Sequence, residues 1–177
     1  KPLPFIEDTA VPPENLASYI REFRKLIESY DLEYAMFGHV DVGCLHVRPA
    51  LDLKNPEEEV WIRELSDQVV ELVKKYGGVM WSEHGRGYRS EYTAEFFGEE
   101  LHHDLRRIKD AFDPENRLNP GKIVTPLSQV TDKVVSIEGP LRGHKDRQIA
   151  PELLKEYETA VNCNGNGACF DYSSKNV

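Results

Sequence analysis

Two histidines, His39 and His46, flank a short run that contains Asp41 and Gly43, and a second run, residues 82–87, places Glu83 directly before His84. Imidazoles and carboxylates bind divalent metals, and an imidazole can also act as a general base near neutral pH. Two imidazoles and one carboxylate would make a three-ligand site with positions left for water or substrate. We therefore predict that the two runs meet as a metal and acid/base site.

The turn between the histidines decides whether their rings can share a metal. A two-residue turn at Val42-Gly43 would set His39 opposite His46 on one face of a hairpin. A three-residue loop with Gly43 left-handed would shift the register by one residue and separate the rings, unless a bulge restores it. Two half-buried sheet histidines, and a solvated turn around Glu83, are the structural alternatives.

The elements around these runs alternate between strand and helix patterns. Apolar residues recur at helical spacing over residues 13–31 and 56–76, and a further helix is expected from Leu101. Asn55 and Pro56 are typical of a helix start. Residues 34–37, 45–47 and 79–81 are strand candidates. If the 79–81 strand continues, Glu83 and His84 point to opposite faces. The pattern predicts an α+β fold, with helices packed on one face of a mainly antiparallel sheet.

The bulk composition narrows the class of protein. The formal net charge of −9 argues against a nucleic-acid or anionic-membrane surface. No apolar run is long enough for a membrane span, and neither a span nor a signal peptide is expected. Three cysteines are too few for a disulfide framework, so a reducing, cytoplasmic compartment is expected. The chain opens without Met, which suggests a piece of a longer protein.

Three ordered motifs resemble the C-terminal cap domain of FAD-linked oxidases, the vanillyl-alcohol-oxidase superfamily that includes D-lactate and D-2-hydroxyglutarate dehydrogenases. The motifs are Gly38-His39 with Gly43 and His46, then Glu83-His84-Gly85-x-Gly87, then Phe112-Asp113-Pro114 with Leu118-Asn119-Pro120-Gly121-Lys122. The resemblance covers roughly residues 1–125. The sequence around Glu7-Asp8 and around Cys44-Leu45-His46 is similar to that of the long bacterial members that are fused to an iron–sulfur module.

The resemblance implies a role for each candidate residue. His39, His46 and Glu83 would bind a divalent metal, with zinc the first expectation, and His84 would be the general base. The implied substrate is a small 2-hydroxy acid. The implied substrate-binding residues are Arg86, Arg89 and Arg48, and the implied flavin-binding residues are Asn119 and Cys44.

The chain departs from the family's pattern between the histidines. Many members have Gly-Asp there and Asn before the leucine, where this chain has Asp41-Val42 and Cys44. That Asn contributes to the flavin side of the pocket in those relatives, so the substitution by Cys44 affects the predicted flavin contacts.

The resemblance also divides the chain. Residues 1–125 would be the cap, residues 126–160 a linker with a short helix, and residues 161–177 the truncated start of an iron–sulfur region. Cys163 and Cys169 would bind a [4Fe-4S] cluster in the full-length protein only, because two thiolates cannot hold such a cluster. An upstream FAD-binding domain and the downstream iron–sulfur domain would be partners within one chain.

The predicted function is therefore a fragment of a flavin-dependent oxidoreductase. It would oxidise a D-2-hydroxy acid, of the lactate or 2-hydroxyglutarate type, to the 2-oxo acid, with electrons passing from FAD to the iron–sulfur module. The electron acceptor could also bring the protein to the inner membrane as a peripheral component. A non-catalytic, metal-stabilised interaction domain is the main alternative, and metal-assisted hydrolysis is a third class.

Overall fold

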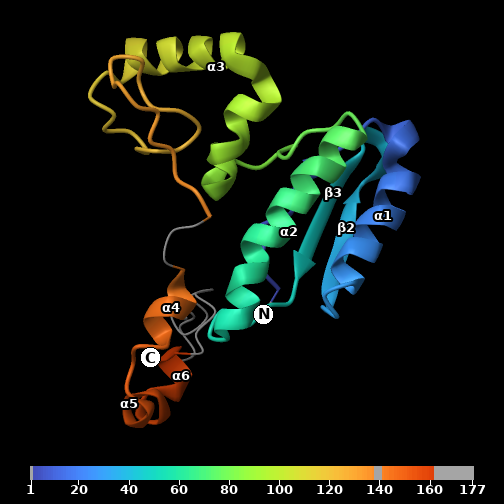
Figure 1. Cartoon of the computed structure of the whole chain (residues 1–177), viewed down its shortest axis with the longest axis vertical. Coiled ribbons are helices and arrows are strands. Elements are labelled where there is room, and N and C mark those ends of the chain that lie inside the picture. The colour runs from blue at the N-terminus through green and yellow to red at the C-terminus, as the bar shows by residue number, and fades with distance from the viewer. Residues whose placement is uncertain (1, 138–140, 162–177) are drawn as a thin grey trace, which may run out of the picture.

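The computed structural model describes residues 2–137 and 141–161 and confirms the predicted α+β fold. The elements in chain order are β1 (Thr9–Ala10), η1 (Pro13–Asn15), α1 (Leu16–Glu28), β2 (Tyr34–His39), η2 (Val40–Val42), β3 (Cys44–Pro49), α2 (Pro56–Lys75), η3 (Gly87–Tyr92), α3 (Thr93–Phe112), α4 (Arg142–Asp146), α5 (Pro151–Glu156) and α6 (Glu158–Val161). Figure 1 shows α1 and α2 beside the sheet, and α3 extending away from it.

The sheet has three antiparallel strands in the order β1-β3-β2. One of its faces carries apolar side chains such as Leu45 and Val47, which join a buried cluster with α1 residues such as Phe23 and α2 residues such as Val69 and Val73. Helices therefore cover one face of the sheet, as the amphipathic spacing predicts. Polar side chains with potential chemistry are left on the opposite face.

The start of α2 is determined by residues that are neighbours in the sequence, and its prediction from the sequence is confirmed. The Asn55 side chain caps the helix by accepting a hydrogen bond from the Glu57 N–H at 3.1 Å, and Pro56 occupies the first helical position. Gly77, with φ of 68°, follows the end of the helix.

Two expected elements differ from the structure. Residues 79–81 do not form a regular strand, because only Val79 pairs, in an isolated bridge with Ala10. The third helix begins at Thr93 rather than Leu101, and a kink at Gly98 (φ 72°, ψ 170°) interrupts it. Glycine tolerates that left-handed backbone, which allows two helical segments to join at an angle.

Candidate metal and acid/base site

The register of β2 and β3 brings the site residues to the uncovered face of the sheet. Phe37 pairs with His46, and His39 pairs with Cys44. Because alternate residues of a strand share a face, these four side chains lie together with that of Arg48. Leu45 and its neighbours point the other way, into the core.

The turn between the histidines is neither of the two turns considered from the sequence. A 3-10 turn, Val40–Val42, is followed by Gly43 in the left-handed conformation (φ 69°), so four residues connect the strands. His39 is therefore paired with Cys44 rather than His46. This is a shift of two residues, which keeps both histidines on one face because the side-chain period of a strand is two. A Cβ on Gly43 would lie 1.8 Å from the Val11 carbonyl oxygen, so no other residue fits.

Glu83 is where the two histidines converge. Its Oε1 lies 2.8 Å from Nε2 of His46 and 3.2 Å from Nε2 of His39. The His46 side chain is 1% exposed, whereas those of His39 and Glu83 are 54% and 45% exposed. One deeply buried imidazole thus anchors the group, and the other two members face solvent.

Asp8 holds the Glu83–His84 segment in place. Its carboxylate accepts hydrogen bonds from the backbone N–H of Glu83 at 2.9 Å and of His84 at 3.0 Å, and lies 3.6 Å from Nη2 of Arg89. Asp8 is fully buried and has a left-handed φ of 68°. A strained, buried carboxylate is retained only where its surroundings fix it, so Asp8 acts as a clamp on the site.

We expect Asp8→Ala to destabilise the fold by about 3 kcal/mol, because it leaves the buried Arg89 without its carboxylate and two N–H groups without an acceptor. Asp8→Asn, which tolerates the left-handed backbone, should cost less. Denaturant unfolding measures the free energy of unfolding of both variants. Asp41→Asn, an exposed acid of the connecting turn, is the matched control. An Asp8→Ala protein with an unchanged unfolding midpoint would refute the clamp.

His84 lies beside the metal-ligand candidates. Its ring stacks on that of His46, with centroids 5.1 Å apart, and its Nδ1 lies 3.5 Å from Oε1 of Glu7. The sequence predicts opposite faces for Glu83 and His84 only if the strand continues through them, and it does not continue. Residues 83 and 84 bend around the Asp8 carboxylate instead of staying extended, so both side chains approach His46.

The donor types, imidazole nitrogen and carboxylate oxygen, are those that suit a first-row divalent ion. Tetrahedral zinc with bonds of about 2.0–2.1 Å separates two nitrogen or oxygen ligands by about 3.3 Å. The contact of Glu83 with His39, at 3.2 Å, is close to that spacing, whereas its contact with His46, at 2.8 Å, is a direct hydrogen bond about 0.5 Å shorter. Among the described residues, Nδ1 of His46 is a buried nitrogen with no hydrogen-bond partner, but it is not the ring nitrogen that faces Glu83.

His39 is the outlying member of the predicted ligand set. Within the described part of the chain, two groups have donor atoms that all lie within 4.8 Å of one another: Asp8, Cys44, His46 and Glu83, and Glu7, His46 and His84. His39 is in neither group, although its Nε2 is near Glu83. Its half-exposed ring must move closer to His46 if both are to bind one ion.

The three candidate arginines occupy different environments. Arg89 is buried and donates to the carbonyl oxygens of Glu7, Met80 and Gly85, so its guanidinium is committed to the fold. Burial lowers its pKa.

Arg86 and Arg48 have aromatic neighbours. The Arg86 guanidinium lies 4.4 Å from the ring centroid of Trp81, a cation–π contact. Arg48 is on the histidine face, where its Nε donates to Oε2 of Glu7 at 2.6 Å and its side chain is 39% exposed. Of the three, Arg48 is placed best to meet a substrate at the site.

The predicted cofactor residues are more scattered. Asn119 is exposed in the turn that precedes Lys122, with a left-handed φ of 46°. Cys44 is buried against His46, and burial, followed by the nearby carboxylates, raises the pKa of its thiol. Cys163 and Cys169 lie outside the described residues.

The sequence alone does not mark Asp8 and Glu7 as site residues, although both belong to one of the motifs described above. Neither has a local pattern that marks its contacts with residues 83 and 84, more than seventy positions away. One signal was available: Glu7 and Asp8 directly precede residues that form a strand, and a carboxylate that is buried there needs a polar partner.

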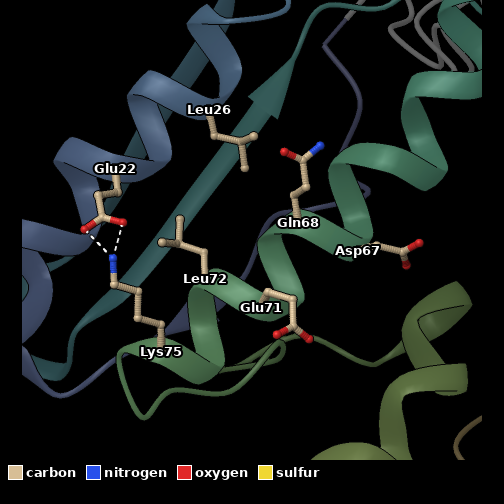
Figure 2. A pocket seen from close by; sticks show the side chains of 7 residues that line it. All are labelled: Glu22, Leu26, Asp67, Gln68, Glu71, Leu72 and Lys75. Carbon is tan, nitrogen blue, oxygen red and sulfur yellow. Dashed lines mark hydrogen bonds and ion pairs between the residues drawn. The ribbon is translucent and has the colours of Figure 1, made fainter.

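A pocket on the other side of the molecule is separate from this site. Figure 2 shows it between α1 and α2, where Glu22 and Leu26 of α1 lie near Leu72 and Lys75 of α2. Glu22 and Lys75 form an ion pair at 2.6 Å. Because these helices cover the apolar face of the sheet, the pocket does not open onto the histidines.

Comparison with known proteins agrees with the resemblance described above. The chain is 56% identical over 177 residues to a D-2-hydroxyglutarate dehydrogenase of Haemophilus influenzae, covering 100% of this chain and 17% of that protein. It is 53% identical over 175 residues to the enzyme of the same name from Escherichia coli, covering 99% and 17%. A D-lactate dehydrogenase of Archaeoglobus fulgidus is 36% identical over 124 residues, covering 68% and 26%.

The chain thus spans only a small part of the length of these relatives. In the described part of the chain, no helix is both long and apolar enough to cross a membrane. Residues 1–123 match the family described as FAD linked oxidases, C-terminal domain. The chain belongs to this family of FAD-linked oxidases.

Proposed function

We propose that this chain is the substrate and metal domain of an FAD-dependent dehydrogenase that oxidises a D-2-hydroxy acid to the 2-oxo acid. The observation that carries the proposal is the convergence of His39 and His46 on Glu83, with His84 stacked beside them. The similarity to D-2-hydroxyglutarate and D-lactate dehydrogenases supports the substrate class.

His39, His46 and Glu83 are the proposed ligands of a divalent metal, with zinc preferred for the imidazole donors. A bound ion would polarise the substrate's 2-hydroxyl group and lower the pKa of that hydroxyl. Asp8 keeps Glu83 in position through the backbone. Glu83 supplies the negative charge that favours a cation at this face, because Glu7 and Asp8 are already paired with Arg48 and Arg89.

His84 is the proposed general base. A 2-hydroxy acid bound beside Glu83 would bring its hydroxyl proton within reach of the half-exposed imidazole, which accepts this proton as the Cα hydride leaves. Glu7, at 3.5 Å from Nδ1, orients the ring so that the other nitrogen faces the substrate side. The flavin supplied by the rest of the protein would receive the hydride.

Arg48 is the proposed partner of the substrate carboxylate. Its Nε is held by Glu7, which fixes the plane of the guanidinium, and the exposed part of its side chain lies on the histidine face. Arg89 remains a weaker candidate because its buried guanidinium already donates to backbone carbonyl oxygens. Arg86 contacts Trp81 as Arg48 contacts Phe37, and Arg48 is preferred because it belongs to the strand face that carries the histidines. Asn119 stays a predicted flavin contact.

The remaining proposals concern the longer protein. FAD would be held mainly by a domain outside this chain, and residues 161–177 would begin an iron–sulfur region in which Cys163 and Cys169 act as ligands. Electrons would then pass from the reduced flavin to that cluster. The boundaries at residues 125 and 160, and a cytoplasmic location, stay predictions.

Anaerobic mixing of the full-length protein with D-2-hydroxyglutarate or D-lactate tests the proposal. We expect the absorbance of oxidised flavin to fall with at least one of these D-2-hydroxy acids and to stay constant with its L-enantiomer. Stopped-flow spectroscopy gives the rate. A full-length protein without flavin, or one whose flavin no 2-hydroxy acid reduces, would contradict the proposed reaction and favour the non-catalytic, metal-stabilised domain.

A further inference from the structure

Cys44 lies in the compact part of the proposed metal site. It is the first residue of β3, it is 1% exposed, and its Cα is paired with that of His39. Its Sγ is 3.6 Å from Nε2 of His46. The donor atoms of Cys44, His46, Glu83 and Asp8 all lie within 4.8 Å of one another. The sheet thus places the thiol of Cys44 close to His46 and Glu83, whereas His39 lies outside this compact group.

The distance between sulfur and imidazole suits a shared ion. Tetrahedral zinc with a Zn–S bond of about 2.3 Å and a Zn–N bond of about 2.0–2.1 Å separates sulfur from nitrogen by about 3.6 Å. The observed distance between Cys44 and His46 has the same value. The contact between His46 and Glu83, at 2.8 Å, is a direct hydrogen bond and would lengthen by about 0.5 Å when an ion replaces its proton.

Asp8 belongs to the same compact group, but its oxygens are already engaged. Both accept backbone hydrogen bonds from Glu83 and His84, and one faces Arg89. Withdrawing this carboxylate to bind metal would leave those donors without an acceptor. Asp8 therefore positions the ligands, and Cys44, His46 and Glu83 are the donors that can turn to an ion.

We propose that Cys44 is a ligand of the metal, together with His46 and Glu83, so that the site contains one thiolate. The inference rests on the metal site of the proposed function and replaces the predicted contact between Cys44 and the flavin. On binding, the thiol would release its proton to water, since only the thiolate is a good ligand. His39 would then complete a four-ligand set, which substrate expands to five.

A thiolate changes which ions the site prefers. Soft sulfur ligands favour zinc, cobalt and cadmium over manganese and magnesium, which prefer oxygen donors. We therefore expect Cys44→Ser to lower the affinity for Zn²⁺ by about tenfold or more and to change the affinity for Mn²⁺ little. A site made only of imidazoles and a carboxylate would show no such difference between the two ions.

X-ray absorption at the zinc edge of the full-length, Zn²⁺-loaded protein tests the proposal, and iron in any cluster does not interfere at this edge. We expect one sulfur scatterer at about 2.3 Å in the wild type, beside nitrogen and oxygen scatterers at about 2.0–2.1 Å. Cys44→Ser should lose the sulfur scatterer. Ser82→Ala, which removes a hydroxyl that contacts the Cys44 side chain, is the matched control and should keep it.

The other results separate the two proposals. Zinc bound by nitrogen and oxygen alone would overturn the role of Cys44 and leave the proposed metal site standing. A protein that binds no divalent ion would overturn both. A sulfur signal that persists in Cys44→Ser comes from another cysteine and overturns the inference. If Cys44→Ser does not fold, Cys44→Ala replaces it in the same measurement.

Discussion

His46→Ala should remove the divalent metal from the protein. His46 is the most buried of the proposed ligands, at 1% side-chain exposure, and it belongs to both compact groups of donors. Its loss takes away one ligand and leaves Glu83 and Cys44 around an empty volume. Outer-shell partners alone are worth about 10–100-fold in metal affinity, so loss of a ligand should weaken Zn²⁺ binding by more than about 100-fold.

Metal analysis of the purified full-length protein measures this effect, and calorimetric titration of Zn²⁺ gives the affinity. His103→Ala is the matched control, because His103 is an exposed histidine of α3, far along the chain from the hairpin. The FAD content of each variant reports whether the protein is still folded. A His46→Ala protein that keeps its metal and binds Zn²⁺ with unchanged affinity would show that the ion, if any, is bound elsewhere.

His84→Gln should slow flavin reduction by the substrate without removing the metal. A general base contributes typically about 10²–10⁴-fold to a rate, and glutamine cannot accept the hydroxyl proton. The metal content should stay constant because Glu83 and His46 keep their contacts. Asp8 binds residue 84 through its backbone N–H, so the substitution preserves the clamp.

Stopped-flow reduction at saturating D-2-hydroxy acid isolates the chemical step from substrate binding. We expect the limiting rate constant to fall in His84→Gln while the substrate dissociation constant changes little, and His103→Gln should behave as the wild type. Equal limiting rates for His84→Gln and the wild type would assign the base to another group. A parallel loss of metal would instead make His84 part of the ligand shell.

Much of this site follows from short-range rules that a sequence displays. The two-residue period of a strand puts His39 and His46 on one face for any even shift in register. The two histidines therefore share a face although the connecting turn differs from the one that would pair them directly. The cap of α2 at Asn55 is equally local. Glu83 and His84 are recognisable from the sequence as a carboxylate and an imidazole side by side at the end of an expected strand.

The parts that could not be predicted depend on distant partners. The bend at Glu83 exists because Asp8 binds two N–H groups far away in sequence, in a backbone conformation that aspartate adopts rarely. The isolated pairing of Val79 with Ala10 likewise results from tertiary contacts and not from strand propensity. The contact of the Cys44 thiol with His46 could not be predicted either, because it depends on the register of the two strands.

The sheet described here is covered by helices α1 and α2 on one face and carries the chemistry on the other, with Glu83 and His84 about half exposed. Hydride transfer needs a site from which water is excluded. If the proposed function holds, the flavin-bearing part of the protein would dock on this face, and the working centre would lie at the seam that closes between the two. A substitution that loosens the seam would lower turnover as an active-site change does, yet leave the metal bound.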